Sequence, residues 1–231
     1  MGYRAVIFDL FGTLVESPPM SDIEATIQSM SEEVRVPHED FRRLWFETND
    51  LRLAGHFPTV TDNVEHICRQ LGYHPTDRQV SKAAGFVGAY SRRCLKRVQP
   101  GAVETMSALS KRGLGLGLIS DATSEVPKAW PTTPFAELIR EPVFSCEVKL
   151  KKPDPRIYLI AAERLHVATS ECVFVGDGGS NELSGAAEAG MFPIMLATPG
   201  QTNPAQVFRP GAQTWQGPVV SSLSELLGEI T

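Results

Sequence analysis

Five short apolar runs, spaced between stretches of helical character, constrain the fold of this chain more than any other feature. The runs cover residues 5–8, 114–119, 142–145, 172–175 and 193–196. Short runs that are apolar at nearly every position are typical of strands buried on both faces of a parallel sheet. The intervening stretches carry helix signals: residues 100–112 stop at Gly113, and residues 154–165 start with Asp-Pro. Strands that alternate with helices predict an α/β fold with a Rossmann-like, doubly wound parallel sheet.

Residues 17–98 interrupt this alternation. They hold no apolar run that indicates a buried strand, and their pattern is helical over residues 21–34, 38–54, 61–71 and 76–97. We therefore expect an inserted cap domain of four helices, and an α/β core domain formed by residues 1–16 and 99–231. Because the insert follows the first strand directly, we expect it to cover the loop after that strand as a lid. The composition of residues 199–218 predicts a long loop, and residues 219–230 a last strand and helix.

Composition narrows the classes of function. The chain has 231 residues, a net charge of −5 and no long Lys/Arg stripe, so we expect no nucleic-acid partner. No stretch approaches the roughly 20 apolar residues of a membrane span, and Asp9 interrupts the short N-terminal apolar run, so we expect neither a membrane partner nor a signal peptide. The four cysteines form no CxxC pair, which argues against a zinc site and favours buried thiols in a reducing, cytoplasmic location.

Polar residues follow the predicted strands at the edge where ligands gather in a doubly wound sheet. Asp9 follows the first strand, Ser120 and Asp121 end the second, and Asp177 follows the fourth. Lys152 comes shortly after the third apolar run. Each of these residues alone is common as a helix cap, a turn residue or a solvent-facing lysine. All of them together, in this order, indicate a site.

The residue types point to one kind of chemistry. A carboxylate can act as a nucleophile, and a Ser hydroxyl, a Lys ammonium and loop amides can hold an anion beside it. Asp177 can join Asp9 around a hard cation such as Mg²⁺, which prefers oxygen ligands. Without a cation, two nearby carboxylates repel and one of them tends to protonate. The pair therefore favours a metal-assisted reaction on an anionic group such as a phosphoryl group.

With these residues in this order, the sequence resembles the haloacid dehalogenase superfamily of hydrolases over nearly its whole length. The matching segments are DLFGTL from Asp9, ISD ending at Asp121, KKPDPRIY with Lys152, and VGDGGSNELSGAAEAGM from Val175. The helical insert stands where one subclass of the family carries a cap after its first motif. The resemblance implies a hydrolase of a small molecule that reacts through a covalent aspartyl intermediate.

The resemblance also implies roles for individual residues. Asp9 would be the catalytic nucleophile, and Thr13 would support its loop. Ser120 and Lys152 would bind the transferred group, and Asp177 would be a ligand of Mg²⁺ together with Asp9. The further residues expected to contact the substrate are Leu10, Phe11, Gly12 and Asp121.

Phe11 departs from the pattern of the family's phosphatases. Those enzymes usually carry a second Asp there, which protonates the leaving alkoxide and then activates water. Phe11 can do neither, although its backbone carbonyl can still serve as a metal ligand. General acid–base help is typically worth about 10²–10⁴-fold. Its loss slows phosphate transfer and favours a good leaving group such as a phenolate.

Two alternatives stay open beside a Mg²⁺-dependent hydrolase of a small phosphate monoester, which is the function that we favour. The 2-haloacid dehalogenases of the superfamily also carry an aromatic residue at this position, because a halide leaves without a proton and without a metal. Their fourth motif resembles Ser-Ser-Asn followed by Asp, whereas this chain has Gly-Asp-Gly-Gly-Ser-Asn-Glu, nearer the metal-binding form. Glu182 replaces the usual final Asp, so we expect it to act through water. The other alternative is a catalytically weak binding or regulatory protein.

Two arginines of the cap segment FRRLW, Arg42 and Arg43, bear on the dehalogenase alternative. In those dehalogenases a cap arginine helps to bind the carboxylate and halide of the substrate. Arginines on an exposed helix face are common, so we expect both side chains to be solvent-facing.

Overall fold

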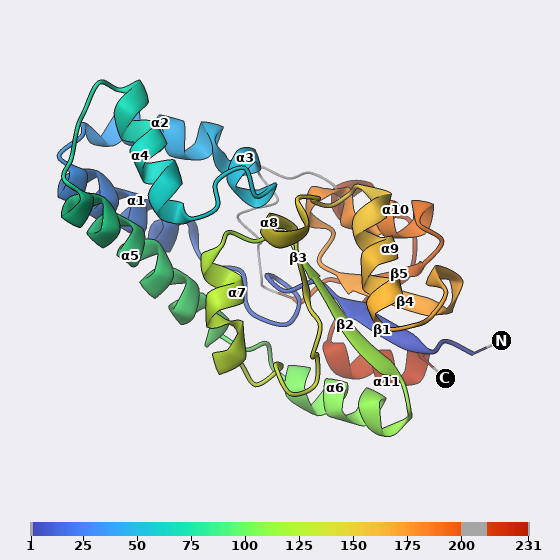
Figure 1. Ribbon diagram of the computed structural model, residues 1–231. Helices are drawn as coiled ribbons and strands as arrows, with labels where there is room; N and C mark the ends of the chain where they lie inside the picture. The colour runs from blue at the N-terminus through green and yellow to red at the C-terminus, as the bar shows by residue number, and fades with distance from the viewer. Residues whose placement is uncertain (1, 200–211, 231) are drawn as a thin grey trace.

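A six-stranded parallel sheet forms the centre of the computed structural model, which describes residues 2–199 and 212–230 (Figure 1). The strand order is β3-β2-β1-β4-β5-β6, so the chain winds outward from β1 in both directions. This confirms the predicted doubly wound α/β fold. Most of the expected loop over residues 199–218 lies outside the described residues. The strands are β1 (Ala5–Phe8), β2 (Gly115–Ser120), β3 (Val143–Phe144), β4 (Cys172–Gly176), β5 (Phe192–Leu196) and β6 (Val219–Val220).

The helices cover both faces of the sheet and fill the insert between β1 and β2. Those after residue 98 alternate with the strands, as the sequence predicts, and the last one follows β6. Their bounds are α1 (Met20–Val34), α2 (His38–Glu47), α3 (Asn49–Leu53), α4 (Val60–Gln70), α5 (Asp77–Leu95), α6 (Ala102–Lys111), α7 (Glu125–Ala129), α8 (Ser145–Val148), α9 (Pro155–Arg164), α10 (Glu182–Glu188) and α11 (Leu226–Glu229).

Strand β1 shows how the apolar runs build the core. Its side chains alternate between the two faces of the sheet because successive residues of a strand point in opposite directions. Val6 and Phe8 pack in the cluster that includes α6 and α11, whereas Ala5 and Ile7 pack in the cluster that includes α9 and α10. Both faces are buried, so every position of the strand has to be apolar.

The cap helices α1, α2, α4 and α5 enclose a hydrophobic cluster of their own, and the cap lies apart from the sheet (Figure 1). The chain enters and leaves this region side by side. Val15 and Val98 form an antiparallel bridge, and the Gln99 amide donates to the Leu14 carbonyl at 2.9 Å. We propose that residues 17–98 are a separate domain, joined to the core at this paired crossing.

Local signals explain where several cap helices begin and end. Capping boxes start α4 at Thr59 and α5 at Thr76. The helix expected over residues 38–54 is divided in two, which is a correction to the four-helix prediction. The break lies at Thr48, whose hydroxyl donates to the Leu44 carbonyl at 2.7 Å. Such back-bonding by a threonine bends helices, and residues 49–53 therefore form a helix of their own, α3.

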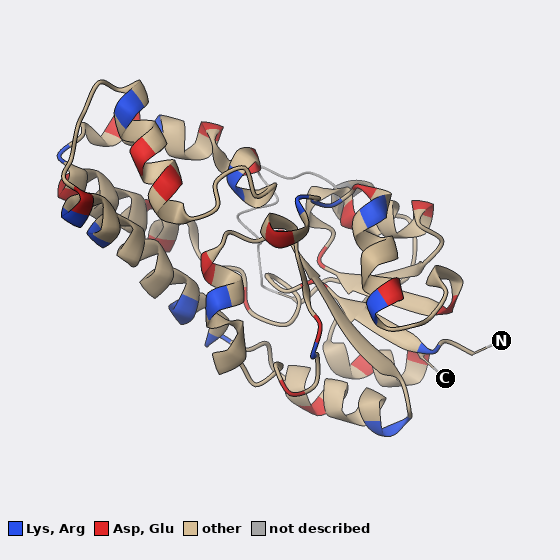
Figure 2. Ribbon diagram, viewed as in Figure 1, with Lys and Arg blue, Asp and Glu red and all other residues tan. Residues whose placement is uncertain are grey.

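The cap contacts the core through α5, which packs against α7, and through α3. Asp50 of this helix pairs with Lys151 at 2.6 Å. A Cβ on Gly55 would lie 2.2 Å from the Cys146 carbonyl oxygen, so the backbones approach closely there. Basic and acidic residues are interspersed over both cap and core (Figure 2). Among the described residues, no helix combines the length and apolar character that crossing a membrane requires.

Candidate active site

The parallel sheet brings the predicted polar residues to one edge. Asp9 directly follows β1, Asp121 follows β2 and Asp177 follows β4. Because β1 lies between β2 and β4, their carboxyl ends are neighbours in space. All three carboxylates belong to buried residues, each at most 8% exposed. The arrangement matches the expectation that this edge collects the ligand-binding groups.

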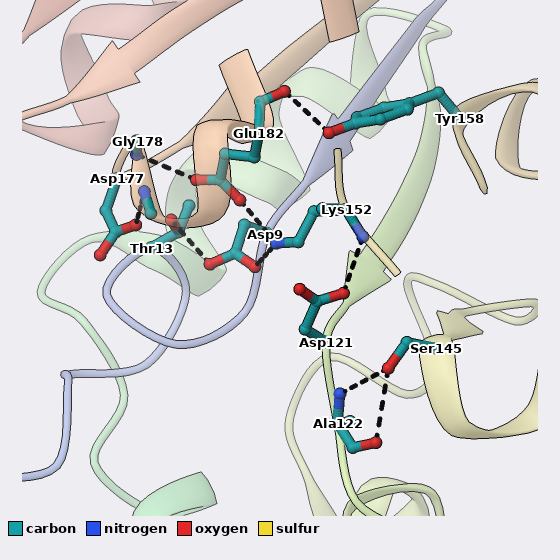
Figure 3. A network of polar contacts seen from close by, with 11 residues as sticks. Asp9, Thr13, Asp121, Ala122, Ser145, Lys152, Tyr158, Asp177, Gly178 and Glu182 are labelled. Atoms are coloured by element: carbon teal, nitrogen blue, oxygen red, sulfur yellow. Dashed lines mark hydrogen bonds and ion pairs between the residues drawn. The ribbon is translucent and has the colours of Figure 1, made fainter. Parts of the chain in front are cut away.

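Lys152 lies at the centre of the site (Figure 3). Its ammonium donates to Asp9 Oδ1 and, at 2.5 Å, to Glu182 Oε2. Its backbone amide donates to Asp121 Oδ1 at 3.0 Å, which fixes the segment that leads into α9. Asp121 therefore positions the lysine through the backbone in addition to lining the cavity, a role that the sequence did not indicate.

Burial and charge compete at this lysine. Burial alone would lower the pKa of Lys152, but the carboxylates of Asp9 and Glu182 outweigh it and raise the pKa well above its usual value. Burial raises the pKa of Glu182 well above its usual range, although the Lys152 ammonium opposes this shift. The lysine is therefore a fixed cation, and the site around it carries an excess of acidic groups.

Asp9, Asp177 and Glu182 form a buried acidic cluster. One carboxylate oxygen from each lies within 4.8 Å of the others. Carboxylate oxygens that converge in this way are the donors that Mg²⁺ prefers. The residues present thus fit a magnesium ion.

The loop after β1 requires glycine for this geometry. Gly12 has a φ of +92°, and a Cβ there would lie 2.2 Å from Asp177 Oδ2. Its amide donates to the Val15 carbonyl at 2.7 Å, so this N–H already has an acceptor within the loop. Gly12 thus lets the Asp9 loop approach Asp177, and its expected contact with the substrate stays a prediction.

The fourth motif folds around its own acids. The Gly178 amide donates to Glu182 Oε1 at 3.0 Å, and the Gly179 amide donates to Asp177 Oδ1 at 2.9 Å. Tyr158 of α9 donates its hydroxyl to the backbone carbonyl of Glu182 at 2.8 Å. Glu182 thus contacts Lys152 directly, a partner that the sequence did not indicate, and its action through water stays a prediction. Tyr158 was not predicted, although it stands in the KKPDPRIY segment.

Two predicted hydroxyl residues lie at the floor of the site. The Thr13 hydroxyl donates to Asp9 Oδ2 at 3.3 Å, as expected for a residue that supports the Asp9 loop. Ser120 Oγ is buried and has no hydrogen-bond partner among the described residues. A buried hydroxyl without a partner is costly, and an anion bound beside it would satisfy it.

A cavity of about 470 Å³ opens between cap and core, within the range of small-molecule sites. Leu10, Gly12, Thr13 and Ser120 are buried and do not line it. Arg42 and Arg43 do not line it either. Arg42 pairs with Glu24 through two nitrogens. The predicted residues that line the cavity are Asp9, Phe11, Asp121, Lys152, Asp177 and Glu182.

The cap contributes an unpredicted part of the cavity wall. It is mainly apolar, with Ile23, Trp45 and Val87 among its members, and it includes the buried Arg52. Tyr90 also lines the cavity, and burial raises the pKa of its hydroxyl. These residues were missed because helical periodicity assigns them equally well to the interior of the cap.

Comparisons with known proteins agree with this geometry. The model of the haloacid dehalogenase-like hydrolases matches residues 3–190. The (S)-2-haloacid dehalogenase 4A of Burkholderia cepacia is 28% identical, over 96% of this chain and 93% of its own. The glyceraldehyde 3-phosphate phosphatase of Methanopyrus kandleri is 27% identical, over 84% of this chain and 83% of its own. The crystal structure of the 2-haloacid dehalogenase of Pseudomonas syringae has a TM-score of 0.71 at 23% identity, covering 98% of this chain and 97% of that one, which shows a shared fold.

Proposed function

This chain belongs to the haloacid dehalogenase-like hydrolases, and on that premise we propose that it is a Mg²⁺-dependent hydrolase of small phosphate monoesters. The observation that carries the proposal is the buried acidic cluster. Asp9, Asp177 and Glu182 each offer a carboxylate oxygen within 4.8 Å of the others, and Lys152 pairs with Asp9 and with Glu182. Oxygen ligands grouped in this way support a hard cation such as Mg²⁺, which would neutralise charge on a bound phosphoryl group.

Asp9 acts as the nucleophile in this proposal. One of its carboxylate oxygens attacks the phosphorus, the bond between phosphorus and the ester oxygen breaks, and the leaving group departs with the electron pair. Water then attacks the phosphorus of the aspartyl-phosphate, which releases inorganic phosphate and a proton and restores the carboxylate. Lys152, Ser120 and the amides of Leu10 and Phe11 hold the phosphoryl oxygens.

The magnesium ion would be held by Asp9 and Asp177, with the backbone carbonyl of Phe11 as a further ligand. When bound, it neutralises charge on the phosphoryl group. Glu182 orients Lys152 through its hydrogen bond to the ammonium, and Thr13 orients Asp9 through its hydroxyl. The cap excludes bulk water while the phosphoryl group is transferred.

Phe11 shapes which esters can react. The side chain lines the cavity and offers no proton to the leaving oxygen. An alkoxide leaving group would need that proton, whereas a phenolate leaves readily without it. We therefore infer that the favoured substrates have a stabilised leaving group, such as an aryl phosphate.

Dehalogenation of 2-haloacids is the second candidate, and Phe11 is the observation that favours it. A relative 28% identical to this chain bears the name of that activity. Neither Arg42, which pairs with Glu24, nor Arg43 lines the cavity, so neither supplies the cap arginine of a dehalogenase here. What speaks against dehalogenation is the acidic cluster of Asp9, Asp177 and Glu182, since that reaction needs no metal.

One assay separates the two candidates. Phosphate release from p-nitrophenyl phosphate is measured with Mg²⁺ and with EDTA, and chloride release from 2-chloropropionate is measured under the same conditions, with Asp9→Asn as the blank. We expect phosphate release that requires both Mg²⁺ and Asp9. Chloride release that is unaffected by EDTA, without phosphate release, would replace this proposal by the dehalogenase.

A further inference from the structure

Arg52 is a buried cation of the cap without an acidic partner. It lies on α3, is 4% exposed, and lines the cavity together with Asp9 and Lys152. Its hydrogen bonds go to the Trp45 carbonyl, the Thr48 hydroxyl and side-chain amides, and among the described residues no Asp or Glu pairs with it. A buried charge normally has a counter-ion, so this arginine calls for an explanation.

The hydrogen bonds of Arg52 leave one edge of its guanidinium open. Nη1 is fully used by three acceptors, whereas Nη2 has a single contact, with Asn49 Oδ1 at 3.3 Å, and Nε has no partner. Of the five N–H groups of an arginine, Nε–H and one Nη2–H therefore lack an acceptor. Nε and Nη2 lie on the same edge of the guanidinium. They form the fork that binds both oxygens of a carboxylate. The acceptors of Nη1 are the Trp45 carbonyl, Thr48 Oγ1 and Asn63 Oδ1.

The existing contacts explain the position of the side chain but not its charge. Every acceptor is a neutral carbonyl, hydroxyl or amide oxygen, and the guanidinium stacks 3.7 Å from the centre of the Trp45 ring. Burial lowers the pKa of Arg52 to about 9, because no carboxylate offsets the desolvation. A neutral amide side chain could donate to several of the same acceptors without the cost of a buried charge.

The other charged groups of the cavity wall already have partners. Lys152 pairs with Asp9 and with Glu182. On the cap side, Glu47 pairs with Arg43 at 3.2 Å. Arg52 and Lys152 are the cations lining the cavity among the described residues, and only Lys152 is balanced by acids.

Arg52 also stands on the part of the cap that is docked onto the core. Asp50, two residues earlier, pairs with Lys151, and Lys151 immediately precedes Lys152. The cap and core walls of the cavity are joined at this contact. Asp9 from the core and Arg52 from the cap thus line one cavity, and a single ligand can meet both.

We propose that Arg52 binds a carboxylate on the leaving group of the substrate, an inference that rests on the phosphatase function proposed above. The substrate class is then a phosphate monoester with two anionic ends, the phosphoryl group at Asp9 and the carboxylate at Arg52. The lining of the cavity is mainly apolar and partly aromatic, with Phe11, Trp45 and Phe46 among its residues. This lining fits an aromatic body, which also supplies the stabilised leaving group that Phe11 requires.

The test compares two ligands of equal shape, 4-carboxyphenyl phosphate and its neutral analogue 4-carbamoylphenyl phosphate. Binding is measured by calorimetry on the Asp9→Asn variant, so that the result does not depend on turnover. We expect the carboxylate to bind about 10- to 100-fold more tightly, the range of a charge-assisted hydrogen-bonded pair. Arg52→Gln in the same background should bring this ratio close to one, and the exposed cap control Arg43→Gln should leave it unchanged.

Two results would overturn the role of Arg52 at once. They are equal affinities of the Asp9→Asn protein for the carboxylate ligand and for its neutral analogue, and the absence of binding. Equal weakening of both ligands by Arg52→Gln also overturns it, because that result indicates only a structural role through Trp45. If Arg52→Gln does not fold, Arg52→Lys keeps the charge without the fork and should retain part of the preference; an undiminished preference counts against the fork. A preference for the carboxylate with no phosphate released by the wild-type protein would refute the phosphatase and keep the anion site.

Discussion

Replacing Gly12 by alanine tests how the Asp9 loop and Asp177 depend on one another. A Cβ at Gly12 would lie 2.2 Å from Asp177 Oδ2, and the residue has a φ of +92°. Gly113 is a matched control, because its φ is +86° and a Cβ there would meet nothing within 4 Å. The two variants share the same backbone strain, and only Gly12→Ala displaces the carboxylate.

The magnitudes of the two effects can be separated. Left-handed backbone strain in a non-glycine residue costs about 1–2 kcal/mol, and each kcal/mol lowers the Tm of a protein of this size by about 2–4 °C. Gly113→Ala should therefore melt about 2–8 °C below the wild type, and Gly12→Ala at least as far below it. In Gly12→Ala the contact must also lengthen from 2.2 Å to the ordinary 3.4 Å, a shift of 1.2 Å. Because Mg²⁺ requires oxygens at about 2.0–2.1 Å with little tolerance, this shift removes a ligand.

The assay is phosphate release over a magnesium titration, with circular dichroism melting of the same preparations. Gly12→Ala should need about 10- to 100-fold more Mg²⁺ for half-maximal activity, the range found when the surroundings of a metal ligand are disturbed. Gly113→Ala should match the wild type in this titration while sharing the loss of Tm. Equal magnesium requirements in Gly12→Ala and Gly113→Ala would refute the placement of Asp177 in the metal site.

Three further outcomes are expected. Asp177→Asn should raise the magnesium concentration needed for activity in the same titration; an unchanged requirement removes Asp177 from the metal site. Phe11→Asp should increase hydrolysis of the natural substrate only slightly, because such a substrate needs no acid, whereas a large gain identifies the chain as a decayed, weakly active member of the family. Burial raises the pKa of the Cys68 thiol to about 11. At pH 8 only about 0.1% of that thiol is ionised, so iodoacetamide labelling of the native protein, read by mass spectrometry, should be slow and should increase with pH; fast labelling at pH 8 would contradict the buried thiol.

The sheet was predictable because burial on both faces leaves a continuous apolar signal. The run over residues 5–8 corresponds to β1 without a shift, and the other runs differ by only a few residues at their ends. β3 is shorter than its run, because it pairs with β2 over only two residues, Val143 and Phe144. Where a strand ends in such a case depends on its pairing with the neighbouring strand and not on the local sequence.

The helices were less predictable where tertiary contacts decide them. Periodicity continues across Thr48, where α2 ends in the structure, and the hydroxyl of this residue donates to the Leu44 carbonyl. The short helices α7 and α8 are too brief to show a helical period. Helices of four or five residues are not stable alone, so their formation depends on packing against the core.

The residues of the site were predictable, but several of their partners were not. Asp9, Lys152 and Asp177 were identified by their positions after strands. The direct contact between Lys152 and Glu182 joins residues 30 positions apart, and no sequence pattern gives that distance. Arg52 was missed because a single arginine between two leucines reads as an exposed helix residue. Its burial results from Trp45 and from Asn63 of α4.

Turnover in water enriched in ¹⁸O tests the central claim most directly. If Asp9 carries a phosphoryl group, water attacks phosphorus, and p-nitrophenyl phosphate yields labelled phosphate while the peptide that contains Asp9 keeps its mass. If Asp9 carries an alkyl ester, as in dehalogenation, attack at the carbonyl carbon places the label in Asp9 itself. The account predicts ¹⁸O in the phosphate and none in the Asp9 peptide; a heavier Asp9 peptide after incubation with 2-chloropropionate, with no label in phosphate, would contradict it.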